Sequence, residues 1–221
     1  LEPVIDGEVS LKEYFGANRY SGLINSVQQP GTALRETVTW YAGYTDEAFF
    51  LAFQVQRPKG APPPSAKTGG EGKFYPQQVF SDDCLEAMFD IGHEAFVLAL
   101  NAKGDYSAYR IRPNDRYKYS PSIRYRARVA ADGWEGELRL GFADFGLKTP
   151  APGDNWRFDL ILNEKTPFDR TAGVTGITDM NQWMNPARFA TLKFAAGNAP
   201  VVQMLRAGNT RNSGGVDLRI L

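Results

Sequence analysis

Three times in this chain, two runs of β-forming residues are joined by a short polar turn, which is the pattern of antiparallel hairpins. The paired runs are residues 37–44 and 48–56, residues 96–101 and 106–111, and residues 123–129 and 134–140. The third turn contains Asp132 and Gly133, a strong hairpin signal because both residues tolerate the backbone angles of a tight turn. Local antiparallel pairing therefore organises most of the chain.

The remaining sequence continues this pattern and offers little helix. Further strand candidates are residues 4–9, 81–90, 156–163, 189–194, 201–205 and 216–220. Short helical turns are expected in residues 142–147 and in residues 11–20, where Tyr14 and Phe15 are predicted to pack inward. Many short strands separated by Gly, Pro and Asp turns predict an all-β fold, an antiparallel, jelly-roll-like β-sandwich with short helical turns only.

Length and charge limit the classes of partner. The 221 residues suit one large β domain, so we predict a single domain over residues 1–221. Because the chain opens directly into Glu2-Pro3-Val4, we expect a domain excised from a larger multidomain protein, with other domains of the same chain as partners. Lys+Arg and Asp+Glu both number 25, and no long apolar run is present, so neither nucleic-acid binding nor membrane insertion is expected.

The sequence contains one cysteine, Cys84, and one histidine, His93. A single cysteine permits no intrachain disulfide, and a single histidine leaves the common zinc sites and the Ser-His-Asp triad incomplete. Most familiar catalytic arrangements are therefore excluded.

Residues 81–90 form an unusual acidic strand, which follows a Pro- and Gly-rich loop at residues 57–78. Alternation places Leu85, Ala87 and Phe89 on one face and Cys84, Glu86 and Met88 on the other. Glu86 is thus a carboxylate on a half-apolar surface, where a charge requires a partner or water. Long loops of this kind are often functional, so the strand and its loop are the first candidate site.

Charged residues also alternate along the third hairpin. Arg124, Arg126 and Arg128 share one face of the first strand, and Glu135 and Glu137 share one face of the second. Opposite charges across paired strands stabilise modestly, and exposed ion pairs are common. We interpret this cluster as a solvated sheet face.

Several stretches together resemble the family 9 carbohydrate-binding modules and the wider group of DOMON-like sandwiches. In chain order they are Pro3-Val4-Ile5-Asp6-Gly7, residues 37–56, residues 81–90, Asp132-Gly133-Trp134-Glu135-Gly136-Glu137, residues 153–160 and residues 183–192. The resemblance spans nearly the whole chain, and each stretch alone is a weak pattern. It specifies a fold more closely than a function.

The resemblance implies a non-catalytic module that attaches a secreted or cell-surface polysaccharide-active enzyme, such as a glycoside hydrolase, to an oligo- or polysaccharide. Family members hold a sugar between two aromatic rings, and the matching positions here are Phe80, or alternatively Phe74 or Tyr75, and Trp183. Their glutamate and arginine, which bond sugar hydroxyls, match Glu86 and Arg110. A structural Glu86–Arg110 ion pair is the alternative interpretation of the last two residues.

A structural calcium ion is the candidate cofactor. Asp82 and Asp83 offer oxygen ligands of the kind that calcium prefers, and Asp6 is a further candidate. Relatives in the family often carry structural calcium, so the resemblance implies the same ion here.

Three other functions stay open at this point. One is a structural or docking sandwich that binds no sugar. Another is a haem-binding, DOMON-like cytochrome domain, for which His93, Met88, Met180 and Met184 are available as axial ligands. The third casts Glu86 with Asp82 or Asp83 as an acid/base pair for glycoside hydrolysis, although neighbouring positions on one strand seldom straddle a sugar.

Overall fold

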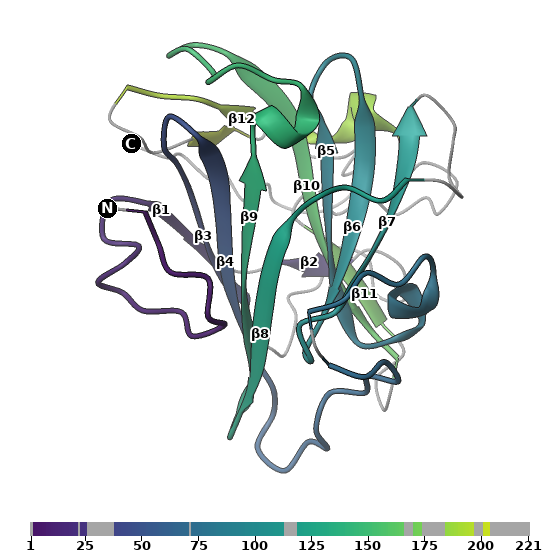
Figure 1. Cartoon of the computed structure of the whole chain (residues 1–221). Coiled ribbons are helices and arrows are strands. Elements are labelled where there is room, and N and C mark those ends of the chain that lie inside the picture. The colour runs from purple at the N-terminus through teal and green to yellow at the C-terminus, as the bar shows by residue number, and fades with distance from the viewer. Residues whose placement is uncertain are drawn as a thin grey trace, which may run out of the picture.

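Two antiparallel sheets face each other in the computed structural model, and the main hydrophobic core fills the space between them (Figure 1). The structure describes residues 2–21, 23–25, 38–70, 72–112, 119–165, 170–173, 184–196 and 201–203. This arrangement confirms the predicted all-β antiparallel sandwich.

The first sheet has five strands. Their spatial order is β1 (Asn18–Ser21), β3 (Val38–Tyr44), β4 (Ala48–Gln56), β9 (Gly133–Gly141) and β8 (Arg124–Ala130). Two of the predicted hairpins, β3–β4 and β8–β9, lie in this sheet as neighbouring strands. Pairing of β4 with β9 joins them into one surface.

The second sheet contains the acidic strand near its middle. Its main order is β13 (Val201–Gln203), β12 (Ala190–Lys193), β10 (Asn155–Glu164), β5 (Cys84–Asp90), β6 (Ala95–Asn101) and β7 (Tyr106–Arg112), while β11 (Arg170–Gly173) pairs with β10 and with β2 (Ile24–Asn25). The predicted hairpin β6–β7 forms one edge. Strand β5 therefore has a neighbour on each side, β10 and β6.

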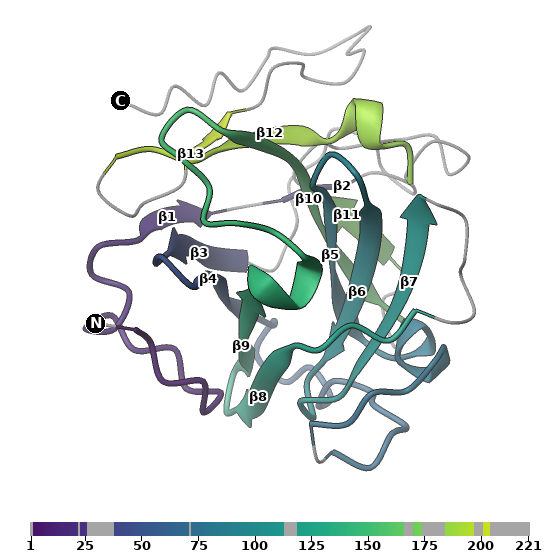
Figure 2. The same ribbon diagram turned by 45° about the horizontal axis from the view of Figure 1, so that its top comes forward.

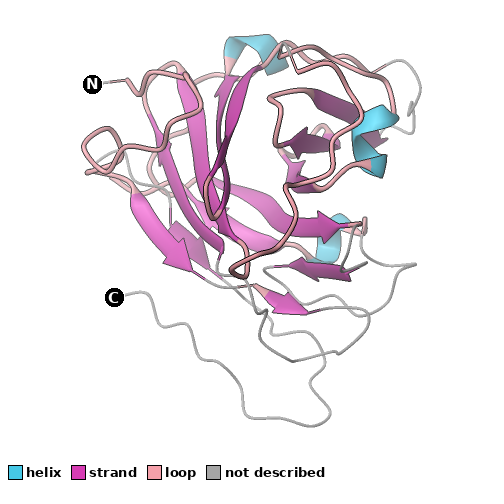
Figure 3. Ribbon diagram, turned by 90° about the horizontal axis from the view of Figure 1, so that it is seen from below, coloured by secondary structure: helices cyan, strands magenta, loops and turns pink. Residues whose placement is uncertain are grey.

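Helix is confined to short 3-10 turns in the described residues (Figure 3). They are η1 (Gln78–Ser81), η2 (Ala143–Phe145) and η3 (Pro186–Arg188). The turn η2, predicted from residues 142–147, lies at one end of the sandwich between the sheets (Figure 2), where Phe145 stacks on Phe96 with ring centroids 5.0 Å apart. No helix in the described segments is long and apolar enough to cross a membrane.

The alternation predicted for the acidic strand is confirmed. Leu85, Ala87 and Phe89 point into the core between the sheets. Cys84 and Met88 belong to smaller clusters on the opposite side of the same sheet. We call the side of each sheet that faces away from the other sheet its outer face.

The amino-terminal predictions were partly wrong. Residues 4–9 form no strand, and residues 11–16 form turns. Tyr14 is 3% exposed as expected, whereas Phe15 is 91% exposed. The physical reason is that this segment lies on the outer face of the first sheet, where Tyr14 packs with Tyr41 and Phe50, so the next side chain points to solvent. The strand predicted at residues 216–220 lies outside the described residues.

Candidate functional site

Glu86 lies on the outer face of the second sheet, in the middle of β5. Its cross-strand partners are Ile161 on β10 and Ala99 on β6. Met88, Val97 and Ile161 form an apolar cluster on this face, and Glu86 itself is only 2% exposed. The sequence thus buries an ionisable group within an apolar surface.

The two oxygens of the Glu86 carboxyl group have different surroundings. Oε1 accepts a hydrogen bond from Asn163 Nδ2 at 2.5 Å. Oε2 is buried and has no hydrogen-bond partner among the described residues. Burial raises the pKa of Glu86 to about 7, against the opposing effects of Lys165 and Asn163. Glu86 therefore has unused hydrogen-bonding capacity and changes protonation near neutral pH.

Phe80, at the end of η1, is half-buried on the same outer face. Its ring packs against Tyr109 of β7 with centroids 4.9 Å apart. It also contacts both small clusters that flank Glu86, the one containing Met88 and the one containing Cys84. Phe80 and Tyr109 thus form an aromatic pair beside the carboxylate, and not a part of the core between the sheets.

Tyr75 also belongs to this region. It is half-buried and contacts the cluster of Val79, Cys84 and Ala99, which Phe80 contacts as well. The Tyr75 hydroxyl accepts a long hydrogen bond of 3.4 Å from Gly69 N. The structure therefore brings Tyr75, Phe80 and Glu86 to one side of the sheet.

Trp183, the second aromatic residue expected at the site, lies outside the described residues. The following residue, Met184, is described, and its sulfur accepts a hydrogen bond of 2.9 Å from the Tyr109 hydroxyl. The role of Trp183 stays a prediction.

Arg110 does not contact Glu86. Strand β6 separates β5 from β7, and Arg110 shares the face of Ala108, a core residue, whereas Glu86 points to the opposite face. Arg110 Nε lies 3.4 Å from Glu94 Oε1, and its guanidinium carbon lies 4.7 Å from the centroid of the Tyr119 ring. The expected Glu86–Arg110 ion pair is therefore wrong, and Asn163 is the described partner of Glu86.

Asp82 and Asp83 bind the preceding loop. Asp82 accepts hydrogen bonds from Lys67 N at 3.0 Å and from Asn101 Nδ2 at 2.9 Å. Asp83 accepts bonds from Ser65 N at 2.7 Å and from Lys165 N at 2.6 Å. Both carboxylates are buried, and all four of their oxygens receive an N–H donor. They hold the loop against the sheet.

Asp6 is not brought to this pair. Its own backbone N–H donates to Glu137 on β9, in the first sheet, whereas Asp82 and Asp83 precede β5 in the second. In the described ranges, no group of three or more His, Cys, Asp or Glu side chains is arranged to hold a metal ion. The three aspartates therefore do not fit a single calcium site, and calcium stays a prediction from the resemblance.

The residues considered for haem are dispersed. Met88 is fully buried in the outer-face cluster, His93 is exposed in the turn between β5 and β6, and Met184 accepts a bond from Tyr109. Met180 lies outside the described residues. The described positions do not present an axial pair for a haem iron.

Glu137 on β9 is also buried, which the sequence did not predict. Glu137 is 0% exposed, and it accepts bonds from Gly7 N at 2.8 Å, Asp6 N at 3.0 Å and the Tyr14 hydroxyl at 2.9 Å. Burial raises the pKa of Glu137 to about 7, and the three hydrogen bonds oppose this effect. The amino-terminal segment thus covers a strand face that was predicted to be solvated.

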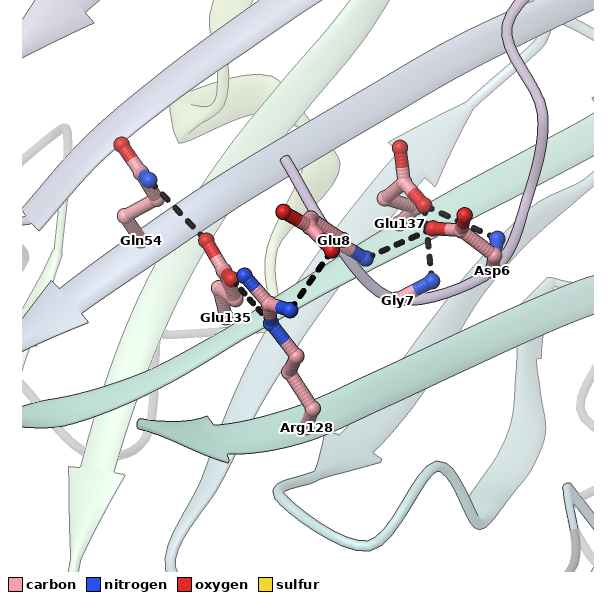
Figure 4. A network of polar contacts seen from close by, with 7 residues as sticks. All are labelled: Asp6, Gly7, Glu8, Gln54, Arg128, Glu135 and Glu137. Atoms are coloured by element: carbon pink, nitrogen blue, oxygen red, sulfur yellow. Dashed lines mark hydrogen bonds and ion pairs between the residues drawn. The ribbon is translucent and has the colours of Figure 1, made fainter. Parts of the chain in front are cut away.

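Arg128, on the same outer face of the first sheet, is half-exposed and forms the cross-strand ion pair with Glu135 that the charge alternation predicted. Arg128 lies between Glu8 and Glu135, with N–O distances of 2.7 Å and 2.5 Å, and Gln54 Nε2 donates to Glu135 at 2.9 Å (Figure 4). Gly7 was the one residue of the sequence that could have indicated that the amino-terminal segment covers Glu137. Its φ is 94°, and a Cβ there would lie 3.0 Å from the backbone of Ala127. Such a close approach requires glycine.

Comparison with known proteins gives a fold but no close relative. No family model and no curated protein matches the sequence. A family 9 carbohydrate-binding module from Caldicellulosiruptor kristjanssonii in complex with cellotriose is 18% identical, with a TM-score of 0.61 over 88% of this chain and 90% of that chain.

Two further solved structures give the same result. A family 9 module from the same organism in complex with glucose is 17% identical, with a TM-score of 0.59 over 87% of this chain and 91% of that chain. A protein from Bacteroides uniformis ATCC 8492 is 14% identical, with a TM-score of 0.63 over 86% and 92% of the two chains. The chain therefore has the fold of the family 9 carbohydrate-binding modules.

Proposed function

We propose that this chain binds carbohydrate on the outer face of the second sheet, with Glu86 as the polar anchor. The observation that carries this proposal is that Oε2 of Glu86, a residue that is 2% exposed, has no hydrogen-bond partner among the described residues. A buried acceptor without a partner is costly, and a ligand donor relieves that cost.

The neighbouring aromatic rings match the other half of a sugar's chemistry. A sugar ring is apolar on its faces and polar at its rim, so a flat ring supports the face while a carboxylate accepts a hydroxyl. Phe80 and Tyr109, whose rings are tilted by 42° with centroids 4.9 Å apart, provide aromatic surface on the face of Glu86. Hydrogen bonds to charged groups contribute about 1.5–3 kcal/mol each. One such bond with ring packing favours a modest affinity.

The fold supports the choice of ligand class. Two solved structures with this fold are family 9 modules in complexes with cellotriose and with glucose. We therefore propose glucose-type oligosaccharides as the first ligands to try, with Trp183 and Tyr75 as further contacts expected from the sequence.

We further propose that the chain is a non-catalytic module that attaches a larger secreted or cell-surface polysaccharide-active enzyme to its glycan. The contacts of Asp82 and Asp83 support a binding role over an acid/base role. Their oxygens accept bonds from Lys67, Asn101, Ser65 and Lys165 N–H groups, so neither carboxylate is directed to a reaction shared with Glu86.

Calorimetric titration with glucose, cellobiose and cellotriose tests the proposal. We expect measurable binding that weakens about tenfold or more in Glu86→Gln, which keeps an acceptor for Asn163 but places a donor where Oε2 stood. Trp183→Ala tests the ring that lies outside the described residues. Glu47→Gln is the control, because Glu47 is an exposed carboxylate in the turn between β3 and β4, in the first sheet.

Two outcomes of the titration would contradict the proposal. If no member of the panel produces heat with the wild-type chain, the site does not bind these sugars, and a structural or docking sandwich becomes the better account. Equal affinities of wild type and Glu86→Gln would remove Glu86 as the anchor.

A further inference from the structure

A pocket of 470 Å³ opens beside η1, separate from the carboxylate of Glu86. Its lining residues come from the Pro- and Gly-rich loop and from η1 and the residues before it: Lys67, Thr68, Gly69, Tyr75, Gln78 and Ser81. The volume lies within the range of about 300–1,000 Å³ that is typical of small-molecule sites.

Hydrogen bonds fix the loop wall of this pocket from behind. Lys67 N donates to Asp82 Oδ1 at 3.0 Å. Thr68 Oγ1 accepts a bond from Asn101 Nδ2 at 2.8 Å, and Thr68 O accepts one from Lys103 Nζ at 3.0 Å. A wall that is already ordered lowers the entropic cost of binding.

The polar groups at the pocket are one ammonium group, one amide and hydroxyls, and the last two can both donate and accept hydrogen bonds. Lys67 brings an exposed ammonium group that forms no ion pair with any described residue, while Gln78, Ser81 and Tyr75 bring an amide and two hydroxyls. Among the described residues, no carboxylate lines the pocket. Lys103 adds a second ammonium group behind the wall, where it binds the carbonyl of Thr68.

The carboxylates of Asp82, Asp83 and Asp105 bind the loop, and none of them lines the pocket. Asp82 and Asp105 are fully buried. Asp105 accepts bonds from Gly70 N at 2.7 Å and Lys73 N at 3.0 Å, and Asp82 accepts the bond from Lys67 N. Backbone N–H groups of the loop, together with Asn101 Nδ2 at Asp82, meet these carboxylates, and the charge that the described residues present to the pocket is the ammonium group of Lys67.

The pocket adjoins the outer face that holds Glu86. Tyr75, one of its lining residues, contacts the same cluster of Val79, Cys84 and Ala99 as Phe80 does. Cys84 precedes Glu86 by two positions on β5 and shares its face. The pocket therefore lies at the Glu86 side of the second sheet, next to η1.

We propose that this pocket is a second subsite for a sugar unit that carries an anionic group, either the carboxylate of a uronic acid or a sulfate ester. The proposal rests on the carbohydrate binding proposed above and names the class of glycan that the complete site prefers. Lys67 pairs with the anionic group, and Gln78 and Ser81 bond neighbouring hydroxyls.

Calorimetry with matched oligosaccharides tests this subsite. The probes are a neutral cello-oligosaccharide, an oligogalacturonate and a sulfated galactan oligosaccharide of the same length, each at low salt. We expect one or both acidic probes to bind about three- to tenfold more tightly than the neutral probe, the magnitude of one partly exposed charged contact. The two acidic arms distinguish carboxylate from sulfate.

Two lysine variants of one loop complete the design. Lys67→Gln removes the ammonium group and is expected to reduce the affinity for the preferred acidic probe to that of the neutral probe. Lys59→Gln is the matched control, because Lys59 is exposed on the same loop but does not line the pocket. It is expected to keep the preference.

The outcomes separate this inference from the proposed function. Equal binding of neutral and acidic probes, with no effect of Lys67→Gln, overturns the anionic subsite and leaves the Glu86 site standing. Acidic binding that survives Glu86→Gln but not Lys67→Gln supports the subsite and overturns Glu86 as anchor. Absence of binding to every probe overturns both.

Discussion

Glu86 and Glu137 occupy similar positions on the two sheets and differ in what meets their oxygens. Each lies in the middle of a strand on an outer face, and burial raises the pKa of each to about 7. Glu137 accepts three hydrogen bonds from the amino-terminal segment. Glu86 accepts one described bond and keeps a buried oxygen without a described partner. Burial and pKa therefore do not distinguish the two glutamates, whereas the number of described hydrogen-bond partners does.

The largest expected difference between Glu86 and Glu137 is in how much each contributes to the free energy of unfolding. Glu137→Ala removes the acceptor of Asp6 N, Gly7 N and the Tyr14 hydroxyl, and we expect a loss of about 4 kcal/mol because each donor left without an acceptor costs about 1–3 kcal/mol. Glu86→Ala strands only Asn163 Nδ2 among the described donors and should cost about 1–2 kcal/mol. Urea unfolding of both variants measures the difference. Equal losses of stability in the two variants would contradict the difference in hydrogen bonding between Glu86 and Glu137.

The pH dependence of stability should reveal both glutamates. Each has a folded-state pKa near 7, above the ordinary value of 4.5, so the folded chain binds more protons than the unfolded chain between these values. The stabilising contribution is full below about pH 4.5 and is lost as the pH rises to about 7, by on the order of 3 kcal/mol for each group. Urea unfolding at several pH values measures this slope.

Glu137→Gln separates the two contributions to that slope. The introduced glutamine side chain would keep an acceptor for the backbone N–H groups and would donate to the Tyr14 oxygen, so the fold should tolerate it. The stability of this variant should fall less between pH 4.5 and pH 7 than that of the wild type. A wild-type curve that rises over this interval would contradict the raised pKa of both groups.

The sequence predicted the faces of strands better than the contacts between distant segments. Period-two alternation placed Glu86 opposite Leu85 and Ala87 correctly, and the three hairpins follow from local patterns. Alternation does not give the order of the strands in a sheet. Arg110 was expected beside Glu86 on the assumption that their strands are neighbours, whereas β6 lies between them. The cover of Glu137 comes from residues more than 120 positions away, in a segment without periodicity, and only Gly7 hinted at it.

The effect of the Phe80–Tyr109 pair on binding should be smaller than that of Glu86. Phe80→Ala removes the ring that contacts both clusters around the carboxylate, and we expect cellotriose affinity to fall about three- to tenfold, in line with about 1 kcal/mol for an aromatic contact. Phe145→Ala is a control for general loss of aromatic packing, because Phe145 stacks on Phe96 at the end of the sandwich. Equal losses of affinity in Phe80→Ala and Phe145→Ala would show that the Phe80 ring does not contact the sugar.

The smallest expected effect is the difference in stability between variants of Tyr14 and Phe15, two adjacent residues of the amino-terminal segment. Tyr14→Phe deletes one donor to Glu137 and should lower the free energy of unfolding by about 1 kcal/mol, since a single buried hydrogen bond contributes about that much. Phe15→Ala should change it by less than about 0.5 kcal/mol, because an exposed side chain without described contacts contributes little. Neither variant should alter cellotriose affinity. A change in affinity with Tyr14→Phe would show that the first sheet also serves the binding site, and the contrast between a satisfied and an unsatisfied glutamate would then no longer separate structure from function.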